Sequence, residues 1–458
     1  MAGQGYRIEK DSMGEMRVPA DSLYGASTQR AVENFPVSGL RFPRSFIHAL
    51  GTIKRVAARV NRELELLGDE EGRAIEAAAV EVAEGKHDAQ FVLDIFQTGS
   101  GTSTNMNANE VIATLASRAL GRSVHPNDDV NLGQSSNDVF PTAVHLAGVE
   151  GIVRRLVPAA TNLAEALDAK GDELAGVVKA GRTHLMDAVP VTLGQELHGH
   201  AAQVRSAANR LSDVVARLAQ VPLGGTAVGT GLNTDPAFAA GVRERLASSG
   251  LPVLPPAHPF EAQASRDGIV DASGAMKVLA VALTKVSNDL RLMASGPRTG
   301  FGEIVLPELQ KGSSIMPGKV NPVIPEVVTQ VAAQVIGNDT AITIGGMNGQ
   351  FELNVHVPLL ARNLLQSIGL LSSASRLFAE KCVTGLEPNR ERNEAYAEGT
   401  LSAATALNPF IGYDKATEIV NEAVASGRSL REVAREAGVE EHVLDEALDY
   451  HKMARPHD

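Results

Sequence analysis

The stretch that decides the fold is SRDGIVDASGAMKVLAVALTKVSNDLRLMAS, residues 265–295. Its apolar residues recur at alternating steps of three and four: Met276, Leu279, Leu283, Val286, Leu290 and Met293. Charged residues such as Lys277 and Asp289 lie between them. This spacing places the apolar side chains on one face of an α-helix, and it predicts a long helix packed nearly parallel to another.

Three further stretches predict helices that pack in the same way. Residues 193–218 repeat the pattern with Leu197, Val204, Ala208, Leu211, Val215 and Leu218. A third helix is expected after Pro322, and a fourth over 358–381. Stripes this long favour a mainly α-helical bundle that also packs against other copies of itself, with a monomeric bundle as the alternative.

The chain reads as three domains. Residues 1–132 are expected to mix short helices with Gly and Pro, 133–390 to form the central long-helix bundle, and 391–458 to form a small domain of short helices. Leu251 to Pro259 (LPVLPPAHP) carries four prolines and is expected to be a loop between two long helices.

Composition excludes several classes of protein. The 458 residues include 54 acidic and 42 basic side chains, a net charge of −12, which disfavours binding to nucleic acid or an anionic membrane. The single cysteine, Cys382, excludes a disulfide framework and an iron–sulfur cluster held by several thiolates. With no apparent signal or membrane segment, we expect a soluble cytoplasmic protein.

Two polar segments in the first half interrupt the helical pattern. Thr98–Asn109 (TGSGTSTNMNAN) concentrates hydroxyls and amides just before a helix expected to begin near Asn109, where they could bind an anion or simply form a cap and turn. Arg122–Asp138 (RSVHPNDDVNLGQSSND) contains a His and several Asp residues. A metal site is conceivable there, but no metal-ligand spacing supports it, and a proline turn capped by Asp is the alternative.

Two more polar segments follow. Gly181–Glu196 (GRTHLMDAVPVTLGQE) presents His184 after Arg182 and Thr183, although a single His is often structural. Gly312–Pro325 (GSSIMPGKVNPVIP) places two serines and Lys319 between hinge glycines Gly312 and Gly318, with Asn321 as the expected cap of a helix that begins at Pro322. These groups suit a carboxylate or oxyanion receptor, and an exposed loop is the alternative.

Other chemistries lack their motifs. Gly225–Gly231 (GTAVGTG) matches a dinucleotide-binding pattern only loosely, and no apolar strand precedes it. The sequence has no phosphate-binding loop, nucleophile elbow or paired-cysteine motif. We therefore expect no cofactor and no metal.

The segment GSSIMPGKVNP (312–322) resembles the signature loop of the fumarase/aspartase superfamily. Six further segments resemble those of the class II fumarases (fumarase C type). In chain order they are TGSGTSTNMN, HPNDDVN, QSSNDVFPTA, GRTHLMDAVPVTLGQE, GGTAVGTGLN and LNPFIGYDKA. Within the superfamily, three residues are typical of the hydratases: His184, Gly318 and Ser136. At the corresponding positions aspartases tend to carry Gln, Ala and Thr, respectively. Departures include Leu132–Gly133, Phe410 and the ending YHKMARPHD.

The resemblance implies a fumarate hydratase of the tricarboxylic acid cycle, a hydro-lyase that interconverts fumarate and (S)-malate by anti addition and elimination of water. It also implies a three-domain homotetramer with a twenty-helix core and active sites shared between subunits. By resemblance, Ser313 is the base, His184 the acid and Glu326 its partner, with the reverse acid–base assignment left open. The implied substrate-binding residues are Ser100, Gly101, Thr102, Ser135, Ser136, Asn137, Thr183, Ser314, Lys319, Val320 and Asn321.

Arg122, His125, Pro126, Asn127 and Asp128 resemble the family's second dicarboxylate site. Two alternative functions remain open from sequence. One is aspartate ammonia-lyase activity on the same scaffold, and the other is a non-enzymatic structural role like that of the relatives found in eye lenses.

Overall fold

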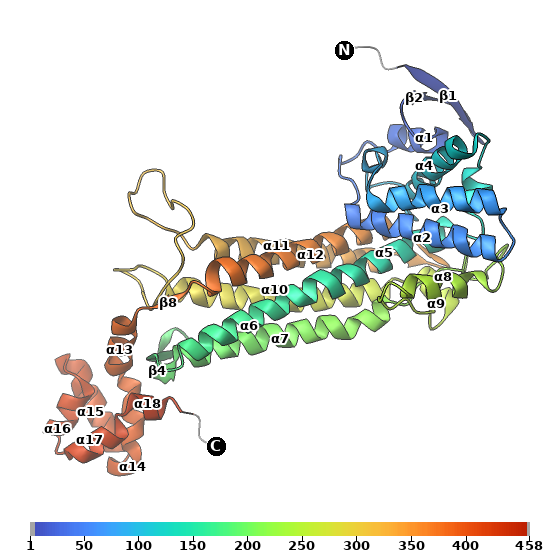
Figure 1. The fold of residues 1–458 in the computed structure, drawn as a ribbon. Coiled ribbons are helices and arrows are strands. Elements are labelled where there is room, and N and C mark those ends of the chain that lie inside the picture. Colours follow the sequence, from blue (N-terminus) through green and yellow to red (C-terminus); the bar gives the residue numbers. More distant parts are fainter. Residues whose placement is uncertain (1–4, 456–458) are drawn as a thin grey trace. The chain divides into compact units, whose positions relative to one another are not determined.

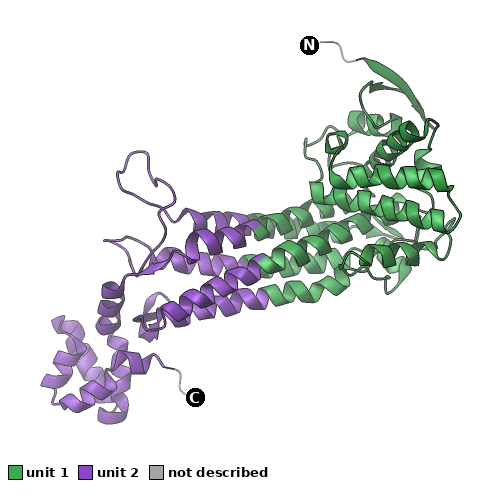
Figure 2. Cartoon of the chain, viewed as in Figure 1, with its two compact units in different colours: residues 1–158, 208–280, 333–372 green, residues 159–207, 281–332, 373–458 purple. Residues whose placement is uncertain are grey.

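The computed structural model describes residues 5–455 and is mainly α-helical (Figure 1). Contacts divide the chain into two compact units, coloured separately in Figure 2. Unit 1 holds the residues up to 158 with 208–280 and 333–372, and unit 2 holds 159–207, 281–332 and the residues from 373 onward. This division does not test the three predicted domains, which stay a prediction.

Five long helices lie in the region predicted to form the central bundle (Figure 1). They are α6 Val157–Glu173, α7 Leu193–Leu218, α10 Asp267–Met293, α11 Val323–Gly346 and α12 Val357–Phe378. The predicted helices over 193–218, 265–295, after Pro322 and over 358–381 are confirmed within a few residues. On α10 the predicted stripe is buried throughout, from Met276 to Met293. On α7 the core uses Val214 where we expected Val215, which is only half-buried.

Unit 1 adds shorter elements around its part of the bundle. Its other helices are α1 Ala26–Asn34, α2 Arg44–Glu63, α3 Asp69–Glu84, α4 Thr102–Leu120, α5 Ser136–Gly151, α8 Phe238–Ala247 and α9 Pro259–Ala264. Its strands form two antiparallel hairpins, β1 Tyr6–Asp11 with β2 Gly14–Pro19 and β6 Gly349–Gln350 with β7 Leu353–Asn354. Single turns of 3₁₀ or π-helix cover Asp88–Gln90, Pro126–Val130 and Ile152–Leu156.

Unit 2 carries two antiparallel strand pairs and the C-terminal helices. The pairs are β3 Val178–Thr183 with β4 Met186–Thr192, and β5 Ile304–Val305 with β8 Glu387–Pro388. The later helices are α13 Arg390–Gly399, α14 Asn408–Ile411, α15 Tyr413–Ser426, α16 Leu430–Glu436, α17 Glu441–Ala447 and α18 Tyr450–Met453, with a 3₁₀-helix at Leu401–Leu407. These short helices enclose a small core of their own that includes Leu407, Ile419 and Leu444.

Two sequence expectations about helix lengths were wrong. The first 132 residues contain long helices, since α2 has 20 residues and α4 has 19. The proline-rich loop joins the short helices α8 and α9, and it ends at His258 because Pro259 is the first residue of α9. Proline fits there because the first turn of a helix needs no backbone N–H donor.

Cys382 lies in a π-helical turn, Ala379–Val383, and is 2% exposed. Burial raises the pKa of its thiol to about 12. Over residues 5–455, no helix is both long enough and apolar enough to cross a membrane.

Candidate active site

The first polar segment forms the start of α4 in unit 1. The helix begins at Thr102, seven residues before the expected position near Asn109. The Ser100 and Thr102 hydroxyl oxygens lie 2.7 Å apart. Gly101 has φ of 77°, and a Cβ atom there would lie 2.2 Å from the Phe140 ring on α5. Only glycine fits this left-handed position against a buried ring.

The start of α5 presents Ser135, Ser136 and Asn137. Ser135 forms a capping box, in which its hydroxyl oxygen accepts from the Asn137 N–H and its own N–H donates to Asp138. The Asn137 amide donates to the Ala227 carbonyl over 2.9 Å. This cap fixes the three predicted binding residues at the positive end of a helix dipole.

Asn105 joins the two segments within unit 1. Its side-chain amide donates to the Ser136 hydroxyl over 3.0 Å and to the Asn131 side-chain oxygen over 3.2 Å. The backbone N–H of Asn105 donates to the Gly101 carbonyl, so Asn105 links the segment around Ser100 to the segment around Ser136. The Ser136 oxygen accepts from Asn105, so its own O–H remains available to donate to a ligand.

Sequence reasoning missed two buried charges behind this cluster, Lys54 on α2 and Asp138 on α5. Both are 0% exposed. Burial lowers the pKa of Lys54 to about 7, and the Asp138 charge opposes that shift. Burial raises the pKa of Asp138 to about 6, although it accepts backbone N–H bonds from Ser135, Gly224 and Thr226. The sequence did contain an indication of the buried lysine. Lys54 continues the three- and four-residue spacing of Ile47 and Leu50, which places it on the apolar face of the helix.

The predicted second dicarboxylate site follows α4 in unit 1. His125 caps the π-helical turn Pro126–Val130, with its Nδ1 accepting from the Asp128 N–H over 3.0 Å. The Arg122 guanidinium is ion-paired with Glu70 and Glu71 on α3. A dicarboxylate bound to Arg122 would therefore have to displace two carboxylates. Asn127 lies inside the turn between Pro126 and Asp128.

His184 lies at the tip of the β3–β4 hairpin in unit 2. Thr183 pairs with Met186, so His184 and Leu185 form a two-residue turn with φ of 55° and 61°. Such turns normally use Asn or Gly, because other residues are strained at positive φ. Thr183 and His184 are exposed, and the His184 side chain makes no hydrogen bond or ion pair within residues 5–455.

A buried charge network supports this hairpin. The Arg182 guanidinium donates to Glu303 over 2.7 Å and lies 4.5 Å from the Phe301 ring centre and 5.3 Å from that of Tyr396. Lys179 on β3 contacts Glu303 and Glu196 at 2.9 and 2.7 Å. Glu303 is 0% exposed and was not predicted as important. The network fixes β3 immediately before Thr183 and His184.

The fourth segment is a loop in unit 2 with a closed neck. The Gly312 N–H donates to the Lys319 carbonyl, and Lys311 pairs with Val320. A Cβ atom at Gly312 would lie 2.5 Å from the Lys319 carbonyl oxygen, so this glycine permits close approach where we expected a hinge. The expected cap was also wrong: α11 begins at Val323, and the Asn321 amide instead donates to the Gly312 carbonyl.

Within the loop, the Ser313 hydroxyl oxygen accepts from the backbone N–H groups of Ile315 (3.2 Å) and Met316 (2.9 Å). Ser313, Ser314, Lys319 and Val320 line a cavity of about 770 Å³. Lys319, Val320, Asn321 and Glu326 line a second cavity of about 840 Å³, which Asn288 and Arg291 of α10 also border. Glu326 lies in the first turn of α11. His184 and Thr183 line neither cavity.

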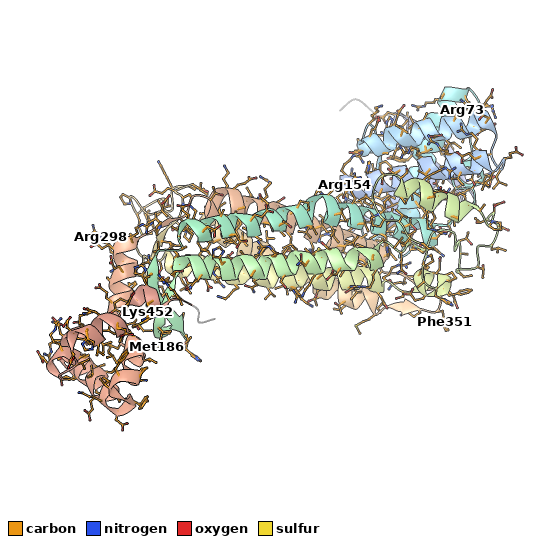
Figure 3. All side chains as sticks on the ribbon, turned by 60° about the horizontal axis from the view of Figure 1, so that its bottom comes forward. Arg73, Arg154, Met186, Arg298, Phe351 and Lys452 are labelled. Carbon is orange, nitrogen blue, oxygen red and sulfur yellow. The ribbon has the colours of Figure 1, made fainter. Side chains whose placement is uncertain are left out.

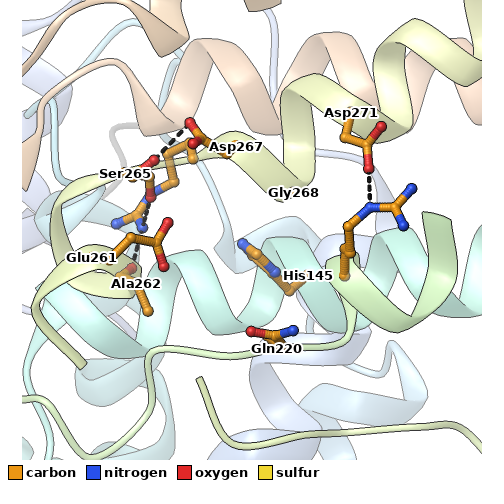
Figure 4. Close-up of a pocket in the computed structure, with 10 residues that line it drawn as sticks. His145, Gln220, Glu261, Ala262, Ser265, Asp267, Gly268 and Asp271 are labelled. Carbon is orange, nitrogen blue, oxygen red and sulfur yellow. Dashed lines mark hydrogen bonds and ion pairs between the residues drawn. The ribbon is translucent and has the colours of Figure 1, made fainter. Parts of the chain in front are cut away.

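A separate cavity of about 390 Å³ in unit 1 contains none of the predicted residues (Figure 4). His145 lines it, with its Nδ1 lying 2.6 Å from the Leu218 carbonyl, and burial lowers the pKa of this imidazole to about 4. Arg266 in the same wall donates to three carbonyl groups at the end of α9. Within residues 5–455, no group of three His, Cys, Asp or Glu side chains is arranged to hold a metal ion.

Comparison with known proteins identifies the family. A family model described as lyase matches residues 14–337, and one described as fumarase C C-terminus matches residues 404–455. A class II fumarate hydratase of Mycobacterium tuberculosis is 54% identical over 98% of this chain and 96% of its own length. The chain belongs to the class II fumarate hydratases.

Two further relatives support the same family assignment. A class II fumarate hydratase of Corynebacterium efficiens is 52% identical over 99% of this chain and 98% of its own length. The crystal structure of a class II fumarase from Schistosoma mansoni superposes with a TM-score of 0.97 at 39% identity, covering 99% of this chain and 100% of that one. The fold expected from the resemblance, mainly α and of the fumarase/aspartase type, is therefore confirmed.

The geometry at Gly101 predicts a large loss of stability on substitution. Gly101→Ala should lower the free energy of unfolding by about 2–5 kcal/mol, through left-handed strain plus overlap with Phe140. Gly121→Ala is the matched control, since its φ is 68° but a Cβ atom there meets nothing within 4 Å. It should lose only about 1–2 kcal/mol. Urea unfolding measures both, and equal losses would contradict the role assigned to Phe140.

Proposed function

We propose that the chain catalyses the reversible hydration of fumarate to (S)-malate, a step of the tricarboxylic acid cycle. The observation that carries this proposal is membership of the class II fumarate hydratases over nearly the whole length of the chain. Aspartate ammonia-lyase activity is the alternative on the same scaffold. His184 favours the hydratase, because aspartases tend to carry Gln at that position.

The reaction poses an electrostatic problem. Removing the proton next to a carboxylate of malate builds a second negative charge on that carboxylate, and the protein itself has a net charge of −12. Preorganised donors must therefore meet the charge where it develops, and one such donor is worth roughly 3–4 kcal/mol. The hydroxyl, amide and ammonium groups of the candidate site suit this requirement.

We assign the base to Ser313. A free serine hydroxyl is too weak an acid to ionise near neutral pH, so its anion needs stabilisation. The two backbone N–H groups that point at Ser313 Oγ supply it, because hydrogen bonds to the charged form favour that form. Lys319 adds a positive charge along the wall of the same cavity. These contacts favour Ser313 over His184 as the group that removes the proton from malate.

We assign the acid to His184. In the dehydration direction, the imidazolium gives its proton to the departing hydroxyl, which leaves as water. In hydration, the neutral imidazole takes a proton from the attacking water. Exposure of His184 at a strained hairpin tip suits a side chain that must reach a substrate. Glu326 is proposed to orient and charge this imidazole in the assembled enzyme.

The remaining predicted residues are proposed to hold the substrate carboxylates. Unit 1 contributes the cluster joined by Asn105, which includes Ser100, Gly101, Thr102, Ser135, Ser136 and Asn137. Unit 2 contributes Thr183, Ser314, Lys319, Val320 and Asn321. The second dicarboxylate site of Arg122 and His125 to Asp128 is proposed to be weak, because Glu70 and Glu71 already neutralise Arg122.

We propose a cytoplasmic homotetramer with active sites shared between subunits. Apolar side chains exposed on the long helices support self-association, including Val281 (53%) on α10 and Ile344 (55%) on α11. Met186 in the His184 hairpin and Phe351 between β6 and β7 (Figure 3) are 70% and 92% exposed. Burying such residues against other copies stabilises an assembly.

A substrate comparison tests the proposed function. The purified protein should convert malate to fumarate, seen as a rise in ultraviolet absorbance, and should release no ammonia from aspartate. Ammonia release without turnover of malate would establish the lyase alternative. Absence of turnover on any dicarboxylate would instead revive a purely structural role.

Two substitutions test the acid–base assignment. Ser313→Ala and His184→Asn should each lower turnover by about 100-fold or more, since each removes a proton-transfer group. Asn tolerates positive φ, so the hairpin should keep its turn. Steady-state kinetics measure the effect, and circular dichroism checks folding. Ser426→Ala, which removes an exposed hydroxyl on α15, is the control and should leave turnover unchanged. Near-normal turnover in a folded Ser313→Ala variant would refute the assignment.

The shared-site proposal predicts that turnover depends on assembly. Dissociated subunits should lose activity even where they keep their helical circular dichroism signal, because the candidate residues of a site would then be separated. Analytical ultracentrifugation paired with assays at matched protein concentration measures this. A fully active monomer would exclude shared sites.

A further inference from the structure

Lys54 is a fully buried lysine whose ammonium contacts side-chain amides. It lies on α2 in unit 1 and is 0% exposed. Within residues 5–455, no carboxylate forms an ion pair with it. Its ammonium instead donates to two side-chain amide oxygens, Asn131 Oδ1 at 2.8 Å and Gln134 Oε1 at 3.0 Å. Burying a cation in this way is costly, and a fold that needed only packing would use an apolar residue there.

The two amides held by Lys54 belong to the loop that leads into α5. Gln134 directly precedes Ser135, and its amide group donates back to the Val130 and Leu132 carbonyls. Asn131 shares its side-chain oxygen between Lys54 and Asn105. Asn105 in turn donates to the Ser136 hydroxyl. A continuous set of hydrogen bonds thus runs from the Lys54 ammonium to a hydroxyl that the proposed function assigns to the substrate.

Which group donates and which accepts is defined at each hydrogen bond between Lys54 and Ser136. The Lys54 ammonium can only donate, so both amide oxygens face it while it carries its proton. Asn105 then presents N–H to Ser136, whose oxygen is occupied as an acceptor. The Ser136 O–H is left to donate, which is the polarity needed for a carboxylate ligand. The Asn131 amide also donates to the Gln134 carbonyl, and the Gln134 amide donates to the Val130 and Leu132 carbonyls, so these carbonyls and the Lys54 ammonium favour the same orientations.

We propose that Lys54 is a positioning residue for dicarboxylate binding: its buried ammonium orients the amides that prepare Ser136, and it places a positive charge behind the start of α5. The inference rests on the proposed function, because it takes Ser136 as a carboxylate ligand. The charged group that acts on Lys54 is Asp138 of α5, while Asn105 of α4 and the two loop amides are neutral. Lys54 therefore supplies a positive charge that these neighbouring groups do not.

The pH dependence of binding has a definite sign. The pKa of Lys54 is lowered to about 7, so the ammonium is charged below this pH and loses its proton above it. A dicarboxylate dianion favours the charged form, so binding raises the pKa of Lys54 and takes up a proton above neutral pH. The KM for malate should accordingly rise as the pH increases through the pKa of Lys54.

The substitution Lys54→Gln tests the proposal with a KM-against-kcat comparison. It should raise the KM for malate and fumarate by about tenfold or more, the equivalent of losing one charge-assisted hydrogen bond, with a smaller change in kcat. The rise of KM above neutral pH should disappear. Lys170→Gln is the matched control, because Lys170 in unit 2 is 7% exposed but pairs with Glu173. It should keep the wild-type KM and pH profile.

Three outcomes decide the matter. A folded Lys54→Gln enzyme with a KM within about twofold of wild type and an unchanged pH profile overturns the proposal. If that variant does not fold, calorimetry on the unmodified protein with succinate decides, run in buffers of different ionisation enthalpy. Proton uptake at about pH 8 supports the role of Lys54, and its absence overturns it. Failure of the proposed function is distinct, since wild-type enzyme would then not turn over malate.

Discussion

An ionised side chain inside a protein is stable only where opposite charge or several hydrogen bonds replace the water it has lost. In each unit, such a group lies directly behind a polar segment of the candidate site. Lys54 and Asp138 hold the start of α5, and Glu303 with Lys179 and Arg182 holds the strand that leads to His184. These segments contribute few apolar side chains to a core. Hydrogen bonds and ion pairs to buried charged groups therefore hold these polar segments in place, whereas hydrophobic packing holds the long helices.

The long helices were predictable from sequence because their packing requires a regular spacing. The stripe from Met276 to Met293 fixes a face of α10 without reference to any other segment, and α7 matches its predicted bounds. Val214 is buried on α7 where the spacing predicted Val215, because a straight helical repeat drifts relative to the faces it contacts. The length of α4 was missed because its first turn is made of hydroxyl and amide residues, which usually indicate a cap or loop.

The candidate site was predicted only in part. Its motifs were recognisable as a set, but the groups that fix them depend on partners remote in sequence: Lys54 meets Asn131 and Gln134, and Arg182 meets Glu303. No local pattern gives such pairings. The backbone of His184 was also unpredictable, because histidine and leucine are poor choices for a turn with two positive φ values. Turn propensity favours Asn or Gly at these two positions, whereas the proposed chemistry requires a histidine at the first of them.

Cys382 is the only thiol in the chain, and it is buried with its ionisation suppressed. Since the thiolate is the nucleophile, maleimides and other alkylating probes find no reactive target in the folded protein. A cysteine introduced at the tip of the His184 hairpin or in the loop between Gly312 and Asn321 would thus be labelled alone. Fluorescence or spin labels placed there could test whether either segment moves when substrate binds, without first removing native thiols.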